Sequence, residues 1–382
     1  MQRPKSKLPG VGTTIFTVMS QLAEESGAIN LSQGFPDFEP PAELLERVSY
    51  HLTHGHNQYP PMTGVSSLRE QIAEKIHRLY GVRPDAAAEV TVTSGATEAL
   101  FCAIHAVVRD GEEVIVLDPA YDSYAPAIRL AGARAVRLPL VPPDFTIDWD
   151  RLRSSINKRT RLLVINTPHN PTGTVLTAED LERLAECLSH QETYVLSDEV
   201  YEHIVFDGRS HATVLANETL AERSFAVFSF GKTYHATGWK VGYCVAPPAL
   251  SDEFRRVHQF NTFTTVTPLQ YALADYLADH PEHYLGLSAF YQQKRDHFLR
   301  VMKSSRLQLI PSKGTYFQLA DYSAVSALED TAFARWLTTE HGVAVIPVSV
   351  FYEDPPRDRY IRFCFAKEEA TLAEAAERLA CL

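Results

Sequence analysis

The stretch EVTVTSGATEALFCAIHAVV (89–108) shows how this chain is built. Residues 89–94 are rich in β-branched side chains, which favour a strand, and a helical pattern follows. Ser94 and Gly95 mark the junction between the two segments. The stretch predicts a strand that leads directly into a helix.

The same order of strand and helix recurs along the middle of the chain. Further apolar strands are predicted at 113–118, 161–166, 193–198, 224–229 and 239–246. This alternation predicts a mainly parallel sheet with helices on both faces. The runs are continuously apolar, which indicates that both faces of the sheet are buried. After a long helical region at 268–303 the pattern changes to α+β, which predicts a second, smaller domain.

Composition limits the kind of partner. The 382 residues carry a formal net charge of −11, which disfavours nucleic acid or an anionic membrane as the main partner. No apolar run reaches the length of a membrane span, and the N-terminus lacks the apolar region of a secretion signal. The 5 cysteines are scattered, which indicates a reducing compartment. We therefore expect a cytoplasmic protein.

Several of the predicted strands end in a polar residue. Open α/β sheets bind ligands in the crevice outside the carboxyl ends of their strands. The residues at these ends are Ser94, Asp118, Asn166, Asp198 and Ser229. Their convergence predicts a binding crevice.

Individual residues near this crevice each have a functional and an ordinary interpretation. Gly95 and Thr97 begin a helix whose N–H groups suit an anion, although this segment taken alone favours a simple turn capped by Ser94 or Thr97. Asp198 ends a buried strand, where a carboxylate needs a positive partner. Tyr201 follows three residues later. Arg362, on an alternating strand, is either a fork for a carboxylate or a surface residue.

Two lysines flank the turn in FSFGKTYHATGWKVGY (228–243). Lys232 follows a buried strand, where a desolvated amine has a lowered pKa and forms a Schiff base with an aldehyde. Lys240 opens the returning strand, where a fixed charge suits a phosphate. For either lysine alone, an ordinary surface position is the alternative.

These candidates form the set that one cofactor requires. Pyridoxal 5′-phosphate needs an amine for its aldehyde, an acid for its ring nitrogen, donors for its phenolic oxygen and an anion site for its phosphate. The chain resembles the fold-type-I aminotransferases of class I and II in NLSQGFPDF, NQYPPMTG, TSGATEAL, NTPHNPTG, SDEVYEHIVFDG, SFGKTYHATGWKVGY and IRFCFA. Within the family it is most similar to the kynurenine/glutamine transaminase branch, especially to bacterial methionine aminotransferases.

The resemblance implies an α/β fold of the type I pyridoxal-phosphate transferases. The large domain would contain a mainly parallel, mixed seven-stranded sheet between helices, beside a smaller α+β domain. Residues 1–45 would form an N-terminal arm and part of the small domain. Residues 46–275 would form the large cofactor-binding domain, and residues 276–382 the small C-terminal domain.

The resemblance also implies how the cofactor is bound. Lys232 would be the Schiff-base lysine and proton carrier, Asp198 would pair with the ring nitrogen, and Tyr121 would stack on the ring. Asn170 and Tyr201 would contact the phenolic oxygen. The phosphate would be bound by Gly95, Ala96, Thr97, Ser229 and Lys240, with Tyr59 supplied by the other subunit of a homodimer.

For the substrate, the resemblance implies that Arg362 binds the α-carboxylate with help from Asn170 and the backbone of Gly34. The aspartate branch commonly has arginine where Lys240 stands, so aspartate is not the expected donor. We expect methionine, glutamine or an aromatic amino acid, reacting with a 2-oxo acid by ping-pong kinetics. The apolar side-chain pocket is expected to contain Phe16, Phe35, Tyr124 and His235.

Two other functions are compatible with parts of this pattern. A carbon–sulfur β-lyase acting on cystathionine or cysteine conjugates shares the cofactor and the first proton removal. A non-catalytic regulator with an aminotransferase-like domain carries an N-terminal DNA-binding module. The acidic charge and a family match that begins near residue 8 disfavour the regulator.

Overall fold

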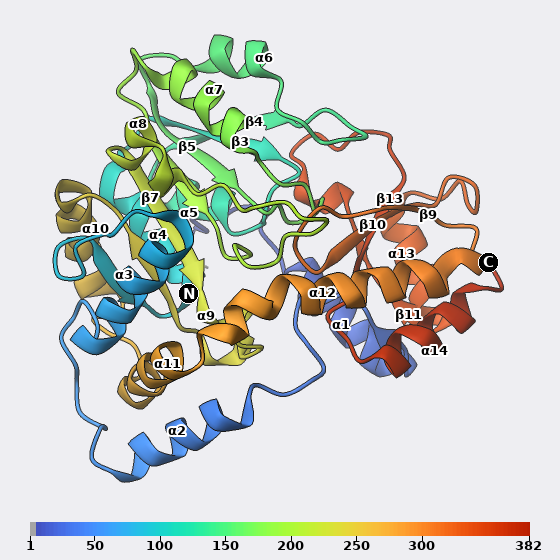
Figure 1. Ribbon diagram of the computed structural model, residues 1–382. Helices are drawn as coiled ribbons and strands as arrows, with labels where there is room; N and C mark the ends of the chain where they lie inside the picture. Colours follow the sequence, from blue (N-terminus) through green and yellow to red (C-terminus); the bar gives the residue numbers. More distant parts are fainter. Residues whose placement is uncertain (1–4) are drawn as a thin grey trace.

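A seven-stranded sheet forms the centre of the larger part of the molecule (Figure 1). The computed structural model describes residues 5–382. Strand β8 runs antiparallel to both of its neighbours, and the pairs among the other strands are parallel. In spatial order the strands are β2 (Val90–Thr93), β8 (Gly242–Val245), β7 (Ser224–Ser229), β6 (Tyr194–Asp198), β5 (Thr160–Asn166), β3 (Glu113–Asp118) and β4 (Arg134–Pro139).

Helices connect the strands and continue to the C-terminus. Local signals set several helix ends: Thr177 and Asp180 form a capping box at the start of α7, and Gly27 ends α1 in the left-handed conformation. The helices are α1 (Ile15–Ser26), α2 (Ala42–Thr53), α3 (Ser66–Tyr80), α4 (Gly95–Val107), α5 (Tyr124–Leu130), α6 (Trp149–Ser155), α7 (Ala178–Leu188), α8 (Glu218–Ala221), α9 (Phe230–Thr233), α10 (Pro248–Asn261), α11 (Thr267–Asp279), α12 (Pro281–Val301), α13 (Asp330–His341) and α14 (Glu369–Leu379).

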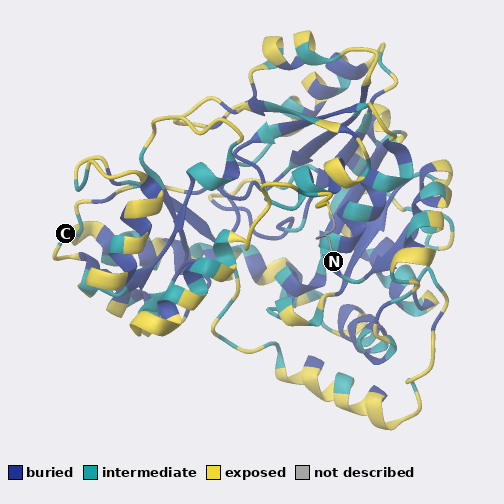
Figure 2. Ribbon diagram, turned by 180° about the vertical axis from the view of Figure 1, so that it is seen from behind, coloured by how far each residue is buried: buried dark blue, intermediate teal, exposed yellow. Residues whose placement is uncertain are grey.

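Both faces of the large sheet are covered. Val114 and Val116 of β3 pack in a cluster with side chains of α4, α5 and α10. Ile115, between them, points to the opposite face and belongs to the cluster that contains buried residues of α3, α6 and α7. Figure 2 shows the strands as the buried interior, with the exposed residues on the outer sides of the helices. Burial on both faces explains the continuous apolar runs in the sequence.

A second, smaller group of strands lies at the far end of α12 (Figure 1). Its four-stranded antiparallel sheet has the order β12 (Ile346–Pro347), β13 (Tyr360–Cys364), β10 (Phe317–Asp321) and β9 (Gln308–Ile310). Strand β1 (Ile29–Asn30) pairs in parallel with β11 (Val343–Ala344), so an N-terminal segment joins C-terminal residues.

The pairing of β1 with β11 is consistent with the prediction that residues 1–45 contribute to the small domain. The domain boundaries at residues 45 and 275 stay a prediction. Residues 1–4 of the predicted N-terminal segment lie outside the described residues.

The structure confirms the predicted mixed seven-stranded sheet and corrects two details. The sequence analysis missed β4, a half-exposed edge strand with arginines at 134 and 137, because it lacks a continuous apolar run. The strand predicted at 239–246 is shorter, because residues 237–239 form a 3₁₀ turn and Lys240 adopts a left-handed conformation. Lys240 therefore precedes β8 and does not open it.

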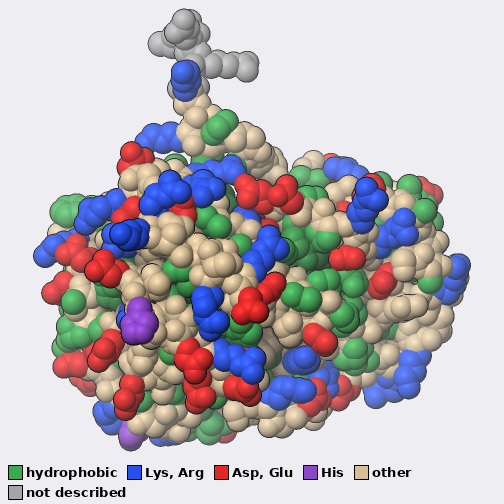
Figure 3. All heavy atoms as spheres, turned by 90° about the horizontal axis from the view of Figure 1, so that it is seen from above, with side chains coloured by type: hydrophobic (Ala, Val, Ile, Leu, Met, Phe, Trp, Pro, Cys, Tyr) green, Lys and Arg blue, Asp and Glu red, His purple; other side chains and the backbone are tan. Residues whose placement is uncertain are grey.

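The surface is mixed in charge. On the face shown in Figure 3, acidic and basic side chains are interspersed over the whole surface, which fits the modest net negative charge. Within residues 5–382, no helix combines the length and apolar character needed to cross a membrane. All 5 cysteines are unpaired.

Candidate active site

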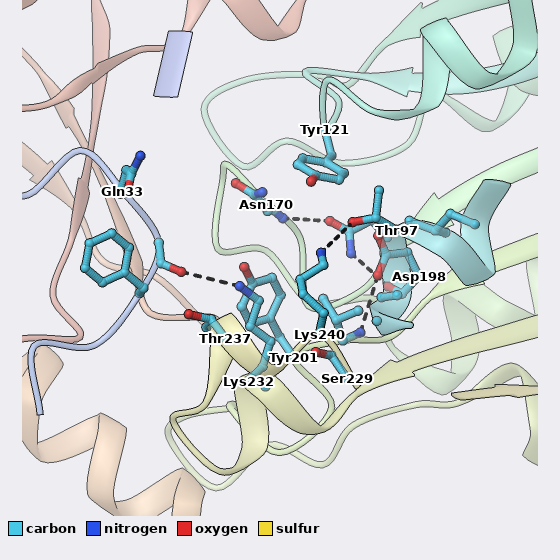
Figure 4. A pocket seen from close by; sticks show the side chains of 18 of the residues that line it. Gln33, Thr97, Tyr121, Asn170, Asp198, Tyr201, Ser229, Lys232, Thr237 and Lys240 are labelled. Atoms are coloured by element: carbon cyan, nitrogen blue, oxygen red, sulfur yellow. Dashed lines mark hydrogen bonds between the residues drawn. The ribbon is translucent and has the colours of Figure 1, made fainter. Parts of the chain in front are cut away.

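A cavity of about 600 Å³ lies between the carboxyl ends of the central strands and the small sheet. Asn166, Asp198 and Ser229, the last residues of β5, β6 and β7, line one side. Arg362 of β13 lines the other side. Figure 4 shows Asp198 and Ser229 around the same space as Lys232 and Lys240. Three of the five polar strand ends predicted to converge therefore line the cavity, whereas Ser94 and Asp118 do not.

The structure brings together all but three of the predicted site residues; the exceptions are Tyr59, Tyr124 and His235. The others come from segments that are far apart in the sequence and meet only through the fold. The predicted residues that line the cavity are Phe16, Gly34, Phe35, Gly95, Ala96, Thr97, Tyr121, Asn170, Asp198, Tyr201, Ser229, Lys232, Lys240 and Arg362.

Lys232 lies in α9, the short helix that follows β7. Its Nζ donates a hydrogen bond to the carbonyl oxygen of Gly34 at 3.3 Å and lies 5.8 Å from the ring centroid of Tyr201. Loss of surrounding water lowers the pKa of Lys232 to about 8. A lysine with this pKa has an appreciable neutral fraction near pH 7, and the neutral amine is the form that attacks carbonyls and accepts protons.

Asp198 is buried at the end of β6. Its Oδ2 accepts a hydrogen bond from the hydroxyl of Tyr124 at 2.6 Å, and its backbone oxygen accepts one from Asn166 at 2.8 Å. Burial raises the pKa of Asp198 to about 6. A carboxylate in this position favours a cationic partner in the cavity, such as a protonated ring nitrogen.

An anion cradle occupies the end of the cavity beside α4. The first turn of this helix presents backbone N–H groups at Gly95, Ala96 and Thr97. Lys240 Nζ lies 3.4 Å from Thr97 Oγ1. A side chain at Gly95 would lie 3.3 Å from the Lys240 side chain, and its φ of +76° also favours glycine. Backbone donors and a cation at this close range suit a phosphate group.

Arg362 is fully buried. Its guanidinium donates to Asn170 Oδ1 at 2.6 Å and to the carbonyl oxygen of Ser32 at 2.9 Å, and it lies 3.8 Å from the ring centroid of Phe317. Its Nε has no hydrogen-bond partner among the described residues, and burial lowers the pKa of Arg362 to about 10. A buried cation with an unused donor is suited to bind a carboxylate.

Together these groups provide an amine, a carboxylate, a helix N-terminus that suits an anion and an arginine that suits a carboxylate in one cavity. A family model described as aminotransferase class I and II matches residues 26–379. The chain belongs to this family.

Individual relatives agree with the family assignment. The chain is 58% identical to the methionine aminotransferase of Escherichia coli strain K12, over 98% of this chain and 97% of that protein. It is 34% identical to kynurenine–oxoglutarate transaminase 1 of Mus musculus, over 98% and 96%.

Solved structures of the family match the fold. The crystal structure of YbdL from Escherichia coli, described with a methionine aminotransferase function, has a TM-score of 0.98, 57% identity and 100% coverage of both chains. An aspartate aminotransferase from Thermus thermophilus has a TM-score of 0.91 at 30% identity, over 100% of both chains. The type I fold implied by the resemblance is therefore confirmed.

Two residues predicted for the aminotransferase side-chain pocket lie elsewhere. Tyr124 is buried and does not line the cavity, because its hydroxyl donates a hydrogen bond to Asp198. His235 packs between Phe38 and Phe290, at 4.9 and 5.5 Å between ring centroids, away from the cavity. The prediction of a direct role in lining the pocket is corrected for both.

Tyr59 also does not line the cavity of its own chain. Its side chain is 85% exposed and its ring lies 5.5 Å from that of Phe263. Exposure of a large aromatic residue fits a contact with another subunit. Its contribution to a second active site stays a prediction.

The sequence analysis missed several lining residues of this aminotransferase site. Phe317 supports the guanidinium of Arg362 because β10 and β13 pair in a register that makes the two residues diagonal neighbours. No local signal links them, since they are 45 positions apart. Gln33 and Thr237 also line the cavity. Gln33 lies in the motif NLSQGFPDF and Thr237 in SFGKTYHATGWKVGY, two of the motifs that indicated the family. These motifs are therefore the sequence signal that could have identified both residues.

Proposed function

We propose that this aminotransferase uses pyridoxal 5′-phosphate to move the α-amino group of methionine, glutamine or an aromatic amino acid to a 2-oxo acid. The observation that carries this proposal is that an amine and a buried carboxylate line the same cavity. Loss of water supports their roles, because it lowers the pKa of the amine and raises the pKa of the carboxylate. The amine is Lys232 and the carboxylate is Asp198. Each group has the chemistry that one end of the cofactor requires.

The cavity residues fit the cofactor part by part. The N-terminus of α4, with Ser229 and Lys240, would hold the phosphate, because Gly95 leaves room for close approach. Tyr121 would cover the ring. When bound, the cofactor supplies an aldehyde that takes the amino group and a ring that delocalises negative charge.

The protein's own residues would then carry the proton transfers. Asp198 would keep the ring nitrogen protonated, and Asn170 and Tyr201 would donate hydrogen bonds to the phenolic oxygen. Lys232 would remove the proton from Cα of the amino acid as general base and deliver it again on the cofactor side. Arg362 would hold the α-carboxylate, which fixes the direction of the Cα–H bond toward the lysine.

The side-chain preference rests on the charge and shape of the cavity. Among the described residues, Arg362 is the sole arginine that lines it, so a second carboxylate has no forked partner. Phe16 and Phe35 supply apolar surface. The relatives named as methionine and kynurenine transaminases support the same class of donor.

We further propose a cytoplasmic homodimer in which Tyr59 reaches the partner's cofactor phosphate. Unpaired cysteines support the reducing compartment, and the exposed ring supports the contact. Sedimentation of the holoenzyme tests the dimer.

The deciding experiment is a panel of amino acids mixed with the holoenzyme without a 2-oxo acid. Conversion of the cofactor to its pyridoxamine form, followed by absorbance, should be greatest with methionine, glutamine and aromatic amino acids. A preference for aspartate would refute the donor class. Steady release of pyruvate and ammonia from cystathionine, faster than transamination, would assign the β-lyase reaction in its place.

A further inference from the structure

A buried polar cluster lies behind the anion cradle, outside the cavity. Glu98 occupies the first turn of α4, Cys102 lies one turn later, and His258 lies near the end of α10. His258 and Cys102 are 0% exposed and Glu98 is 9% exposed. These three side chains are not needed by the chemistry proposed above, so their burial requires another explanation.

The cluster is a hydrogen-bond network, although its three side chains also have the spacing of metal ligands. Glu98 Oε1 accepts hydrogen bonds from His258 Nδ1 at 2.6 Å and from Cys102 Sγ at 3.1 Å. Burial and the neighbouring carboxylate raise the pKa of the Cys102 thiol, so the sulfur keeps its proton. The polar atoms of the three side chains are thus already paired with one another.

His258 links two segments in this arrangement. Its Nδ1 faces the Glu98 carboxylate, and its Nε2 faces the carbonyl oxygen of Met62 at 3.0 Å. Both ring nitrogens therefore lie within hydrogen-bond distance of an oxygen atom. Glu98 and His258 form a buried hydrogen-bonded pair, so removal of either side chain leaves a buried polar group without its partner.

The outer contacts of this pair reach two functional segments. Glu98 Oε2 accepts a hydrogen bond from the backbone N–H of Ser94 at 2.9 Å, which fixes the turn into the anion cradle. Met62 belongs to the loop that carries Tyr59, and the ring of Tyr59 packs on Phe263 just beyond the end of α10. One hydrogen-bonded pair thus connects the cradle of this subunit with the loop proposed to serve the partner.

We propose that Glu98 and His258 are positioning residues for the cofactor phosphate, which hold the Ser94 turn and the Tyr59 loop in one fixed arrangement. This inference rests on the proposed function, since it assumes that the cradle binds a phosphate and that Tyr59 crosses a dimer interface. Neither residue touches the cofactor. Their effect passes through two backbone groups, the N–H of Ser94 and the carbonyl of Met62.

The test compares the binding of pyridoxal 5′-phosphate and of pyridoxal, which lacks the phosphate, to the apo-protein by absorbance titration. His258→Gln should weaken the binding of pyridoxal 5′-phosphate by about tenfold or more, because a neutral amide cannot serve both acceptors. The binding of pyridoxal should change by less than about threefold. His105→Gln, the same substitution at a histidine of α4 outside the cluster, is the matched control and should leave both affinities unchanged.

A double-mutant cycle with Tyr59→Phe separates positioning from a general loss of structure. If His258 positions the Tyr59 loop, the loss caused by Tyr59→Phe in wild type should shrink in the His258→Gln background. Independent losses that multiply would overturn the link to Tyr59. Equal weakening of both ligands, or no weakening of either, would overturn the positioning role.

A second variant, Glu98→Gln, is used if His258→Gln does not fold. It retains an oxygen acceptor and removes only the charge of the carboxylate. Its binding of pyridoxal 5′-phosphate should still weaken more than its binding of pyridoxal, but by less than in His258→Gln. Unchanged binding of pyridoxal 5′-phosphate by a folded Glu98→Gln protein would overturn the inference. A wild-type protein that binds no pyridoxal 5′-phosphate would refute the proposed function itself, whereas normal wild-type binding with unaffected variants refutes only the positioning role.

Discussion

Replacement of Arg362 by lysine should separate carboxylate binding from the chemical step. The guanidinium already donates to Asn170 at 2.6 Å and to the Ser32 carbonyl at 2.9 Å, and its remaining N–H groups include a buried Nε without a partner. A substrate carboxylate would take two of these N–H groups side by side. Lysine keeps the charge and offers one nitrogen, so at least one of the two bonds is lost.

The expected size of the effect follows from that single bond. A hydrogen bond between charged groups contributes about 1.5–3 kcal/mol. A loss of this size raises KM for the amino acid by about 10- to 150-fold. The charge of lysine would still hold the carboxylate and so keep most of the orientation of the Cα–H bond. Most of the loss should therefore appear in KM, and kcat should fall by less than about fivefold.

Steady-state kinetics with methionine as donor measures both constants, and two controls identify the cause. Arg295→Lys is a matched variant, because Arg295 makes a forked pair with Asp207 at 2.8 and 2.7 Å away from the cavity. It should lower stability and leave KM unchanged. An amine that lacks the α-carboxylate should react with wild type and Arg362→Lys at similar rates. An unchanged KM, or an equal loss with that amine, would refute the assigned role of Arg362.

Three other predictions concern lysines. Lys240→Arg should retain most activity because it keeps a fixed charge beside the cradle. Lys232→Arg should lose nearly all activity and the imine absorbance of the bound cofactor. Equal losses of activity in the two variants would contradict the two roles. Lys75→Met should lower the free energy of unfolding, measured with urea, by about 3–5 kcal/mol, because it leaves the buried carboxylate of Glu202 without its cation. Adding Glu202→Gln to the same chain should restore part of this loss. In the apo-protein, burial lowers the pKa of Lys232 to about 8, so the unfolded chain binds more protons between about pH 8 and pH 10.5 and stability rises with pH in that window. The stability advantage of Lys232→Met over wild type should therefore shrink as the pH rises through this window, and a constant difference would contradict the lowered pKa.

The sequence predicts best what depends on local pattern. The buried strands were recognisable because apolar runs and polar strand ends are both local, and their order along the chain leads to the crevice that contains Asp198 and Lys232. Contacts that depend on packing between distant segments were not predictable. Tyr124 has the aromatic character expected of a pocket residue, but the fold directs its hydroxyl to Asp198. The support of Arg362 by Phe317 depends on the register of two strands far apart in the chain.

Backbone conformation distinguishes the two lysines of the turn at 228–243 more clearly than their spacing. Lys232 lies in helical backbone, and its altered chemistry comes from the loss of water around the amine. Lys240 has a φ of 54°, a left-handed conformation that costs a side-chain-bearing residue about 1–2 kcal/mol. Glycine would relieve this strain, but it would remove the ammonium group 3.4 Å from Thr97 Oγ1. Strain that is kept beside a cavity supports a functional role for the strained residue. The role proposed for Lys240 is a fixed charge in a set position, and the role proposed for Lys232 is reactivity. The same type of side chain would then serve two purposes within nine residues of sequence.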